Sequence, residues 1–125
     1  MLDPPYWLQA RGKYSGDPSG LGNVSLNDYL EAWQRVLVTC REHLAPDGCL
    51  AFIVGPAEDR ENDRVVDLAF LMYREAVDVG FSHHRRIMVA CNTQQASGQQ
   101  VEWARENRRV LKLYGDLVIL ATGLQ

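Results

Sequence analysis

The chain has 125 residues, of which 46% are hydrophobic and 23% charged, and its formal net charge is −3. These values are ordinary for one globular domain with a single core. No apolar run approaches the roughly 20 residues of a membrane span, and no signal peptide precedes Asp3, so we expect a cytoplasmic protein with no membrane partner. Three cysteines without CxxC spacing predict reduced thiols, not a disulfide framework or zinc site: Cys40, Cys49 and Cys91.

The first chemical signal is the stretch Asp3-Pro4-Pro5-Tyr6-Trp7. Consecutive prolines hold φ near about −65° and remove two backbone donors, so this stretch neither continues a strand ladder nor begins an ordinary helix. Backbone carbonyls and the Asp3 carboxylate remain as acceptors, and the two aromatic residues add flat faces. Such a set suits a planar ring that carries N–H donors, as a nucleobase with an exocyclic amine does. The alternative is a rigid Pro-Pro turn that leaves a strand.

The tetrapeptide DPPY resembles the catalytic (D/N/S)PP(Y/F/W) motif of the amino-methyltransferases, which methylate adenine N6 or cytosine N4 in DNA. The resemblance implies that Asp3, Pro4, Pro5 and Tyr6 form the catalytic motif at the C-terminal end of a strand, with Asp3 and Pro4 beside the cofactor S-adenosylmethionine. It also implies that Asp3 and the Pro4 carbonyl accept hydrogen bonds from the target amine, while Tyr6 stacks on a flipped base. The aspartate favours adenine N6 and leaves cytosine N4 open.

Residues 7–24 are rich in glycine and have no helical or strand period, which predicts a long mobile loop. After a catalytic turn, such a loop could close as a flap over target or cofactor. Trp7, Lys13 and Tyr14 are the residues best able to contact nucleic acid there. The alternative is simple linker flexibility.

Ser25 and Asp28 form a start like a capping box, and apolar residues then recur at helical spacing. A helix is therefore predicted from Leu26 to Leu44, with Trp33 in its buried stripe. The turn at residues 46–48 ends this helix.

The continuous apolar run Cys49–Val54 predicts a strand covered on both faces. The turn before it, Leu44-Ala45-Pro46-Asp47-Gly48, and the strand together resemble the "L-x-P-x-G then strand" passage of Rossmann-like methyltransferases.

Residues 57–64 are acidic and polar, which predicts a surface loop before a second helix capped near Asn62 or Asp63 and ending near Gly80. The predicted buried side of this helix consists of Val65, Val66, Leu68, Ala69, Met72, Tyr73 and Ala76.

A third strand is predicted from Arg86 to Cys91. The preceding pair, His83 and His84, would point to opposite faces of a strand, so we expect no metal site there.

Residues 92–100 are amide-rich without a hydrophobic period, and we expect a polar loop. Amide side chains can pair with base edges, and the resemblance places Thr93, Gln94 and Gln95 near the flipped base and the DNA. An ordinary polar hairpin loop is the alternative.

Val101 to Lys112 predicts a short basic helix with Trp103 and Val110 turned inward, followed by a last strand over residues 116–122. Residues 82–115 contain six basic and two acidic residues, a net charge of +4 on an otherwise acidic chain. This stretch could face phosphates, through Arg105 and Arg108 in particular, or be a solvated helix face.

These elements indicate one α/β domain over residues 1–125, and the resemblance implies a partial Rossmann-like methyltransferase fold, with a mostly parallel sheet and a C-terminal antiparallel strand. The glycine-rich turn that usually binds S-adenosylmethionine is missing, since Gly20-Leu21-Gly22 has no preceding strand. The chain resembles only the catalytic half of a permuted DNA amino-methyltransferase, so we expect a fragment, a split-gene product or a degenerate relative. It would be inert alone unless a second chain or missing segment, or self-association into a homo-oligomer, supplies the cofactor half. The alternatives are an RNA guanine-N2 methyltransferase relative, a non-catalytic nucleic-acid-binding module and an unrelated α/β domain.

Overall fold

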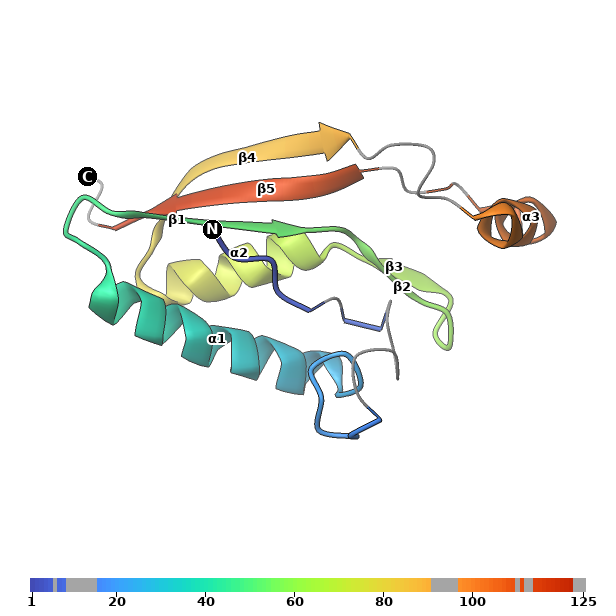
Figure 1. The fold of residues 1–125 in the computed structure, drawn as a ribbon, viewed down its shortest axis with the longest axis horizontal. Helices are drawn as coiled ribbons and strands as arrows, with labels where there is room; N and C mark the ends of the chain where they lie inside the picture. The colour runs from blue at the N-terminus through green and yellow to red at the C-terminus, as the bar shows by residue number, and fades with distance from the viewer. Residues whose placement is uncertain (6, 9–15, 91–96, 110, 112–113, 123–125) are drawn as a thin grey trace.

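The computed structural model describes residues 1–5, 7–8, 16–90, 97–109, 111 and 114–122, without the side chains of His83 and His84. The described residues form three helices and five strands (Figure 1). In chain order they are α1 (Leu26–His43), β1 (Cys49–Val54), β2 (Ala57–Asp59), β3 (Arg64–Val66), α2 (Leu68–Val79), β4 (Ser82–Ala90), α3 (Gly98–Glu106) and β5 (Tyr114–Ala121).

The main sheet has the strand order β1-β5-β4, and both of its pairings are antiparallel. Since β5 lies between β1 and β4, those two outer strands run in the same direction and β5 runs against both. Leu2 adds a parallel bridge to Phe52 at the outer edge of β1. The expected α/β class and antiparallel final strand are confirmed, but the sheet is not mostly parallel: both ladders between its named strands are antiparallel, because β5 is inserted between the two strands that share a direction.

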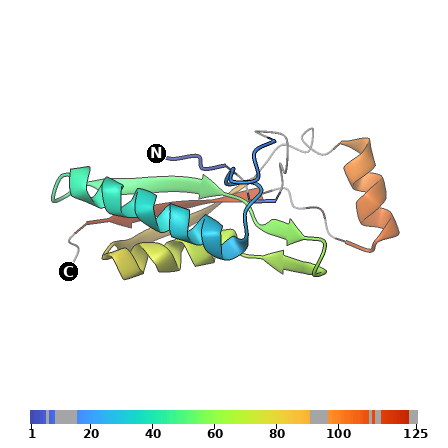
Figure 2. The same cartoon turned by 90° about the horizontal axis from the view of Figure 1, so that it is seen from below.

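Both long helices cover one face of this sheet (Figures 1 and 2). Phe52 pairs with Val118, which pairs with Arg86, so these three side chains share the helix face. Trp33 of α1 packs edge-on against Phe52 with ring centroids 5.0 Å apart, and its indole N–H donates to the Met72 carbonyl at 3.1 Å. The predicted core role of Trp33 is confirmed.

The expectation that Cys49–Val54 is covered on both faces is wrong. Alternate residues of β1 are buried, namely Leu50, Phe52 and Val54, whereas Ala51 and Ile53 are only half-buried. The reason is that α1 and α2 lie on the same side, and no described helix lies over the other face (Figure 1).

The first helix follows the prediction closely. The Ser25 side chain accepts the Asp28 backbone N–H at 3.1 Å, and Leu44 is the C-cap. A capping side chain satisfies one of the orphan donors of the first turn.

The second helix starts later than predicted. Its N-cap is Asp67, whose carboxylate accepts the Phe70 N–H at 3.1 Å. Val65 and Val66 belong to β3, which pairs with β2, so residues 57–64 are mostly a hairpin and not a surface loop. The predicted end is confirmed at Gly80, whose φ of 103° suits a residue without Cβ.

The hairpin is organised around Asp59, which is 4% exposed. Its carboxylate accepts from the Asn62 side chain at 2.8 Å and from the Arg64 Nε at 2.9 Å. The hydrogen bond from Asn62 and then the one from Arg64 lower the pKa of Asp59.

This pairing should make stability depend on acid pH. Because the folded pKa of Asp59 lies below the unfolded value of about 3.9, its contribution is complete above that value and is lost as the pH falls through the folded pKa. We expect the melting temperature to fall below about pH 4, and the fall to be smaller in Asp59→Asn than in wild type. Thermal melts from about pH 6 to pH 2.5 test this, with Asp47→Asn in an exposed turn as control. An identical acid dependence of Asp59→Asn and wild type would contradict it.

The last third differs from the prediction at its boundaries. β4 begins at Ser82, with an irregularity between His83 and Arg85, and β5 spans Tyr114–Ala121. Helix α3 starts at Gly98, because the Ser97 and Gln100 side chains form a reciprocal capping box, so residues 97–100 of the expected polar loop are the cap and first turn.

Helix α3 also ends sooner than predicted, at Glu106. Asn107 caps it and Arg108 has a φ of 53°. Trp103 is half-buried and Ala104 is the buried residue, while Val110 and Lys112 lie outside the described residues. In the described part of the chain no helix is long and apolar enough to cross a bilayer.

Candidate functional site

The Asp-Pro-Pro segment leaves the sheet directly after its one point of pairing. The Leu2 N–H donates to the Ala51 carbonyl at 2.8 Å and the Leu2 carbonyl accepts from Ile53 at 3.1 Å. Pro4 and Pro5 have no N–H to continue this ladder. The segment therefore leaves the edge of the sheet beside the second half of β1.

The segment is held by the first turns of α1 and by the residue just before its N-cap. The Tyr29 hydroxyl donates to the Pro5 carbonyl at 2.8 Å, and the Trp7 indole N–H donates to the Val24 carbonyl at 2.9 Å. Tyr29 is 2% exposed and Trp7 is 4% exposed. With its ring in the core, Trp7 has no free face for a nucleobase, so this geometry does not support the nucleic-acid contact expected of it.

Two acceptors of the motif stay available. Within the part of the chain that the structure describes, neither the Asp3 carboxylate nor the Pro4 carbonyl has a hydrogen-bond or ion-pair partner, and Asp3 is exposed. The Pro5 carbonyl, by contrast, is taken by Tyr29. The arrangement can accept N–H donors at Asp3 and Pro4.

A pocket of about 170 Å³ lies between this segment and α1. Asp3, Pro4 and Pro5 form one wall, and Tyr29 and Trp33 belong to the other. An apolar cavity of about 150 Å³ is enough to hold a benzene ring, so this pocket suits one small ring or an apolar side chain. Its remaining lining residues are Leu2, Leu21, Ala32 and Val36.

The loop after the motif is fixed at both described ends. Leu8, Leu21 and Val24 pack against the core, and Asn23 donates its backbone N–H to the Gly20 carbonyl at 2.8 Å. Six residues proposed to be functional lie outside the described residues: Tyr6, Lys13, Tyr14, Thr93, Gln94 and Gln95.

Helix α3 lies off the end of the sheet at which β1 and β4 finish (Figure 1). It contacts the β2–β3 hairpin, since the Arg60 guanidinium carbon is 4.0 Å from the centroid of the Trp103 ring and Arg109 pairs with Asp63. Arg105 has an 80% exposed side chain and a 3.8 Å ion pair with Glu102, and Arg108 is exposed. Both arginines are therefore accessible to a polyanion.

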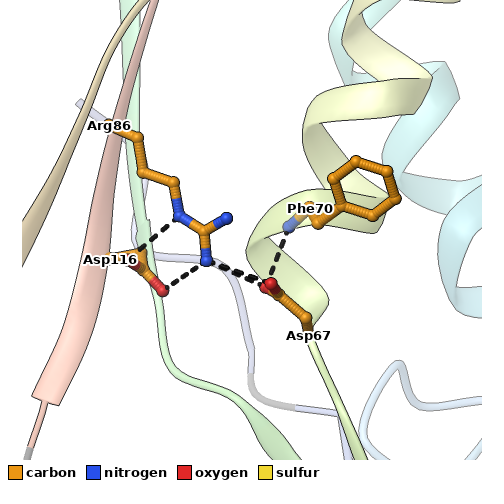
Figure 3. Close-up of polar contacts among 4 residues, drawn as sticks. All are labelled: Asp67, Phe70, Arg86 and Asp116. Carbon is orange, nitrogen blue, oxygen red and sulfur yellow. Dashed lines mark hydrogen bonds and ion pairs between the residues drawn. The ribbon is translucent and has the colours of Figure 1, made fainter.

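The basic stretch of residues 82–115 is not one continuous cationic surface. Arg109 is neutralised by Asp63, and Arg86 lies between β4, β5 and α2 (Figure 3). Arg86 donates to both oxygens of Asp116, at 3.1 and 3.0 Å, and to Asp67 at 3.0 Å. Hydrogen bonding to Asp116, and then to Asp67, raises the pKa of Arg86 above its usual range.

This three-residue ion cluster was not predicted from the sequence. Asp116 is 4% exposed, and Asp67 is also the N-cap of α2. Arg86 thus ties β4 and β5 to the start of α2. Asp67 lies 19 residues and Asp116 lies 30 residues from Arg86 along the chain. No local sequence pattern indicates such a pairing. In the described residues no group of three metal-binding side chains lies together.

The fold resembles part of a known enzyme structure. No family model and no curated protein matches the sequence. Solved structures of TTHA0409 from Thermus thermophilus, assigned as a DNA modification methylase, are similar. The structure of TTHA0409 complexed with S-adenosyl-L-methionine matches with a TM-score of 0.64 and 20% identity, over 98% of this chain and 44% of that one. Its selenomethionine derivative matches with a TM-score of 0.62 and 16% identity, over 79% and 38%.

This chain therefore spans less than half the length of that protein. At such identity the likeness establishes a shared fold. The chain has the fold of part of this methylase.

Proposed function

We propose that this chain is the catalytic half of an S-adenosylmethionine-dependent DNA amino-methyltransferase, with adenine N6 as the favoured target and cytosine N4 as the other. The observation that carries the proposal is that the Asp3 carboxylate and the Pro4 carbonyl, directly after the Leu2–Phe52 bridge, have no partner among the described residues. The likeness of the fold to a methylase structure supports it. The resemblance of DPPY to the amino-methyltransferase motif supports it independently of the fold.

In this proposal the motif acts by orientation and electrostatics. The target amine donates its N–H groups to the Asp3 carboxylate and the Pro4 carbonyl, so that its lone pair points toward the methyl donor. The amine nitrogen would bond to the methyl carbon as the carbon–sulfur bond breaks, and it would then lose one proton. The Asp3 carboxylate would stabilise the positive charge that grows on the nitrogen. No covalent intermediate with the protein is needed, and none of the cysteines takes part. Tyr6 is proposed to stack on the flipped base.

The described residues fit only one side of an S-adenosylmethionine site. Asp3 is exposed and Pro4 half-buried beside the pocket, so both could contact the cofactor. A pocket of about 170 Å³ is too small for the whole molecule. When bound, S-adenosylmethionine supplies the electrophilic methyl group; the greater part of its binding surface has to come from outside these residues.

Two uncovered surfaces support a second chain or segment as the provider of that surface. The sheet face opposite α1 and α2 presents Ile87 and Val89, 43% and 36% exposed, beside half-buried residues of the neighbouring strands. Among the described residues, the outer edge of β1 is paired at one point, the bridge from Phe52 to Leu2. An open edge and a bare apolar face are surfaces that α/β proteins normally cover. DNA is the other proposed partner, through Arg105, Arg108 and the undescribed residues Lys13, Tyr14, Thr93, Gln94 and Gln95.

Titration of S-adenosylmethionine into the isotope-labelled chain tests the proposed function. A half-site should bind weakly, so we expect no calorimetric heat in the micromolar range but NMR shifts at millimolar ligand, confined to residues 3–5 and the pocket lining. Micromolar binding would show that self-association completes the site, and methyl-transfer assays would follow. Unperturbed motif signals at millimolar ligand would contradict the proposal, and DNA binding with a steep salt dependence in that case would indicate a non-catalytic module.

A further inference from the structure

The strongest unassigned contact near the motif is made by Tyr29. This residue lies in the first turns of α1, 24 residues from Pro5 along the chain, and its hydroxyl donates to the Pro5 carbonyl at 2.8 Å. The same hydroxyl lies 4.0 Å from the Met72 sulfur. With only 2% of its surface exposed, Tyr29 is fixed between the motif and α2.

The motif needs an external anchor because it cannot form its own. Pro4 and Pro5 lack N–H groups, so no ladder continues beyond Leu2. The next described contact along the chain is the Trp7 indole on the Val24 carbonyl, directly before α1. Tyr29 of α1 therefore holds the chain at Pro5, and the Val24 carbonyl directly before the helix holds it at Trp7.

Fixing the Pro5 carbonyl also restrains the acceptors before it. The Pro4–Pro5 peptide is planar, and the ring holds φ of Pro5 near about −65°. Only ψ of Pro5 is then soft between the anchored carbonyl and the plane that contains the Pro4 carbonyl. A hydrogen bond at Pro5 thereby limits the directions in which Pro4, and Asp3 before it, can point.

We propose that Tyr29 is a positioning residue: it occupies the Pro5 carbonyl and so selects Asp3 and Pro4 as the acceptors that meet the target amine. This inference rests on the proposed function for the identity of the target. The anchoring itself is a property of the chain, and it can be measured without substrate or cofactor.

The test compares three residues at position 29 in the full chain labelled with ¹³C. Tyr29→Phe removes the donor, and p-aminophenylalanine at position 29 restores an N–H donor on the same ring. Carbonyl ¹³C shifts of Pro4 and Pro5 and the side-chain shift of Asp3 are recorded, together with ¹³Cα order parameters of Asp3 and Pro4. Tyr114→Phe is the matched control, since this hydroxyl has no partner among the described residues.

In Tyr29→Phe we expect the Pro5 carbonyl ¹³C shift to change, and the Pro4 carbonyl and Asp3 side-chain shifts to change with it. The order parameters of Asp3 and Pro4 should fall from about 0.85 toward 0.6 or below, while the signals of β1 and β5 stay in place. The p-amino variant should restore part of each change, and Tyr114→Phe should show none. If Tyr29→Phe does not fold, wild type is compared with the p-amino variant alone. A difference between these two proteins in the Pro5 carbonyl shift must then be accompanied by differences in the shifts of Asp3 and Pro4.

Asp3 and Pro4 signals that stay unchanged while the Pro5 signal moves would overturn the proposal and leave Tyr29 a core residue. Failure of the proposed function has a different signature. Asp3 and Pro4 would then respond to the change at position 29 but not to S-adenosylmethionine at millimolar concentration.

Discussion

Replacing Asp3 by alanine is expected to lower methyl transfer by about 10²–10³-fold, the loss typical for one preorganised group that stabilises developing charge. The substitution removes the exposed carboxylate that is proposed to bind the amine, and it removes no contact of the described core. Transfer of a labelled methyl group to unmethylated DNA measures the effect, in any preparation in which the cofactor half completes the site.

The matched control for this experiment is Asp47→Ala, which removes an exposed carboxylate from the turn between α1 and β1. Its turnover should equal that of wild type, and circular dichroism should show the same fold for both variants. Turnover of Asp3→Ala within twofold of wild type would eliminate the proposed role of Asp3. Digestion of the product to nucleosides separates N6-methyladenine from N4-methylcytosine, and N2-methylguanine in RNA would indicate the alternative enzyme class.

Replacing Arg86 by methionine is expected to lower the free energy of unfolding by about 2–4 kcal/mol. The substitution leaves the Asp116 carboxylate, with a 6% exposed side chain, without its cation. The Arg86 side chain is 38% exposed, so the expected loss of stability is smaller than for a fully buried pair. A domain of this size is typically stable by about 5–15 kcal/mol, so urea denaturation should show a clearly reduced midpoint.

The neighbouring residue supplies the control for Arg86. Arg85 is exposed on the opposite face of β4, and Arg85→Met should change stability by less than about 0.5 kcal/mol. The double variant Arg86→Met with Asp116→Leu should recover part of the loss, because no unpaired carboxylate remains buried. Equal stability of Arg86→Met and Arg85→Met would contradict the structural role of the ion cluster.

The two expected effects concern different parts of the same end of the sheet. Asp3 is exposed and is proposed to bind the target amine, whereas Arg86 holds β4 and β5 against the N-cap of α2. A variant of Asp3 should therefore lose activity at constant stability. A variant of Arg86 should lose stability first.

The sequence by itself determined the elements whose signals are local. Capping at Ser25 and helical spacing located α1, the apolar run located β1, and the αL residue Gly80 ended α2. The consecutive prolines likewise determined that the chain leaves the sheet at the motif, because Pro4 and Pro5 carry no ladder donor.

The tertiary structure alone decided the features that depend on residues distant in the chain. It inserted β5 between β1 and β4, and it left one face of β1 uncovered, which a continuous apolar run cannot reveal. It also showed that the acidic residues 57–64, expected to form a surface loop, belong to the β2–β3 hairpin, in which Arg64 donates to the Asp59 carboxylate.

The same limit applies to the candidate site. Local sequence named Asp3 and Pro4, but only the fold showed Trp7 in the core and the Tyr29 hydroxyl on the Pro5 carbonyl. The physical reason is that backbone conformation follows from neighbouring residues, whereas burial and hydrogen-bond partners are set by packing between elements. The sequence therefore specified the acceptors, and the tertiary structure decided which of them remain free.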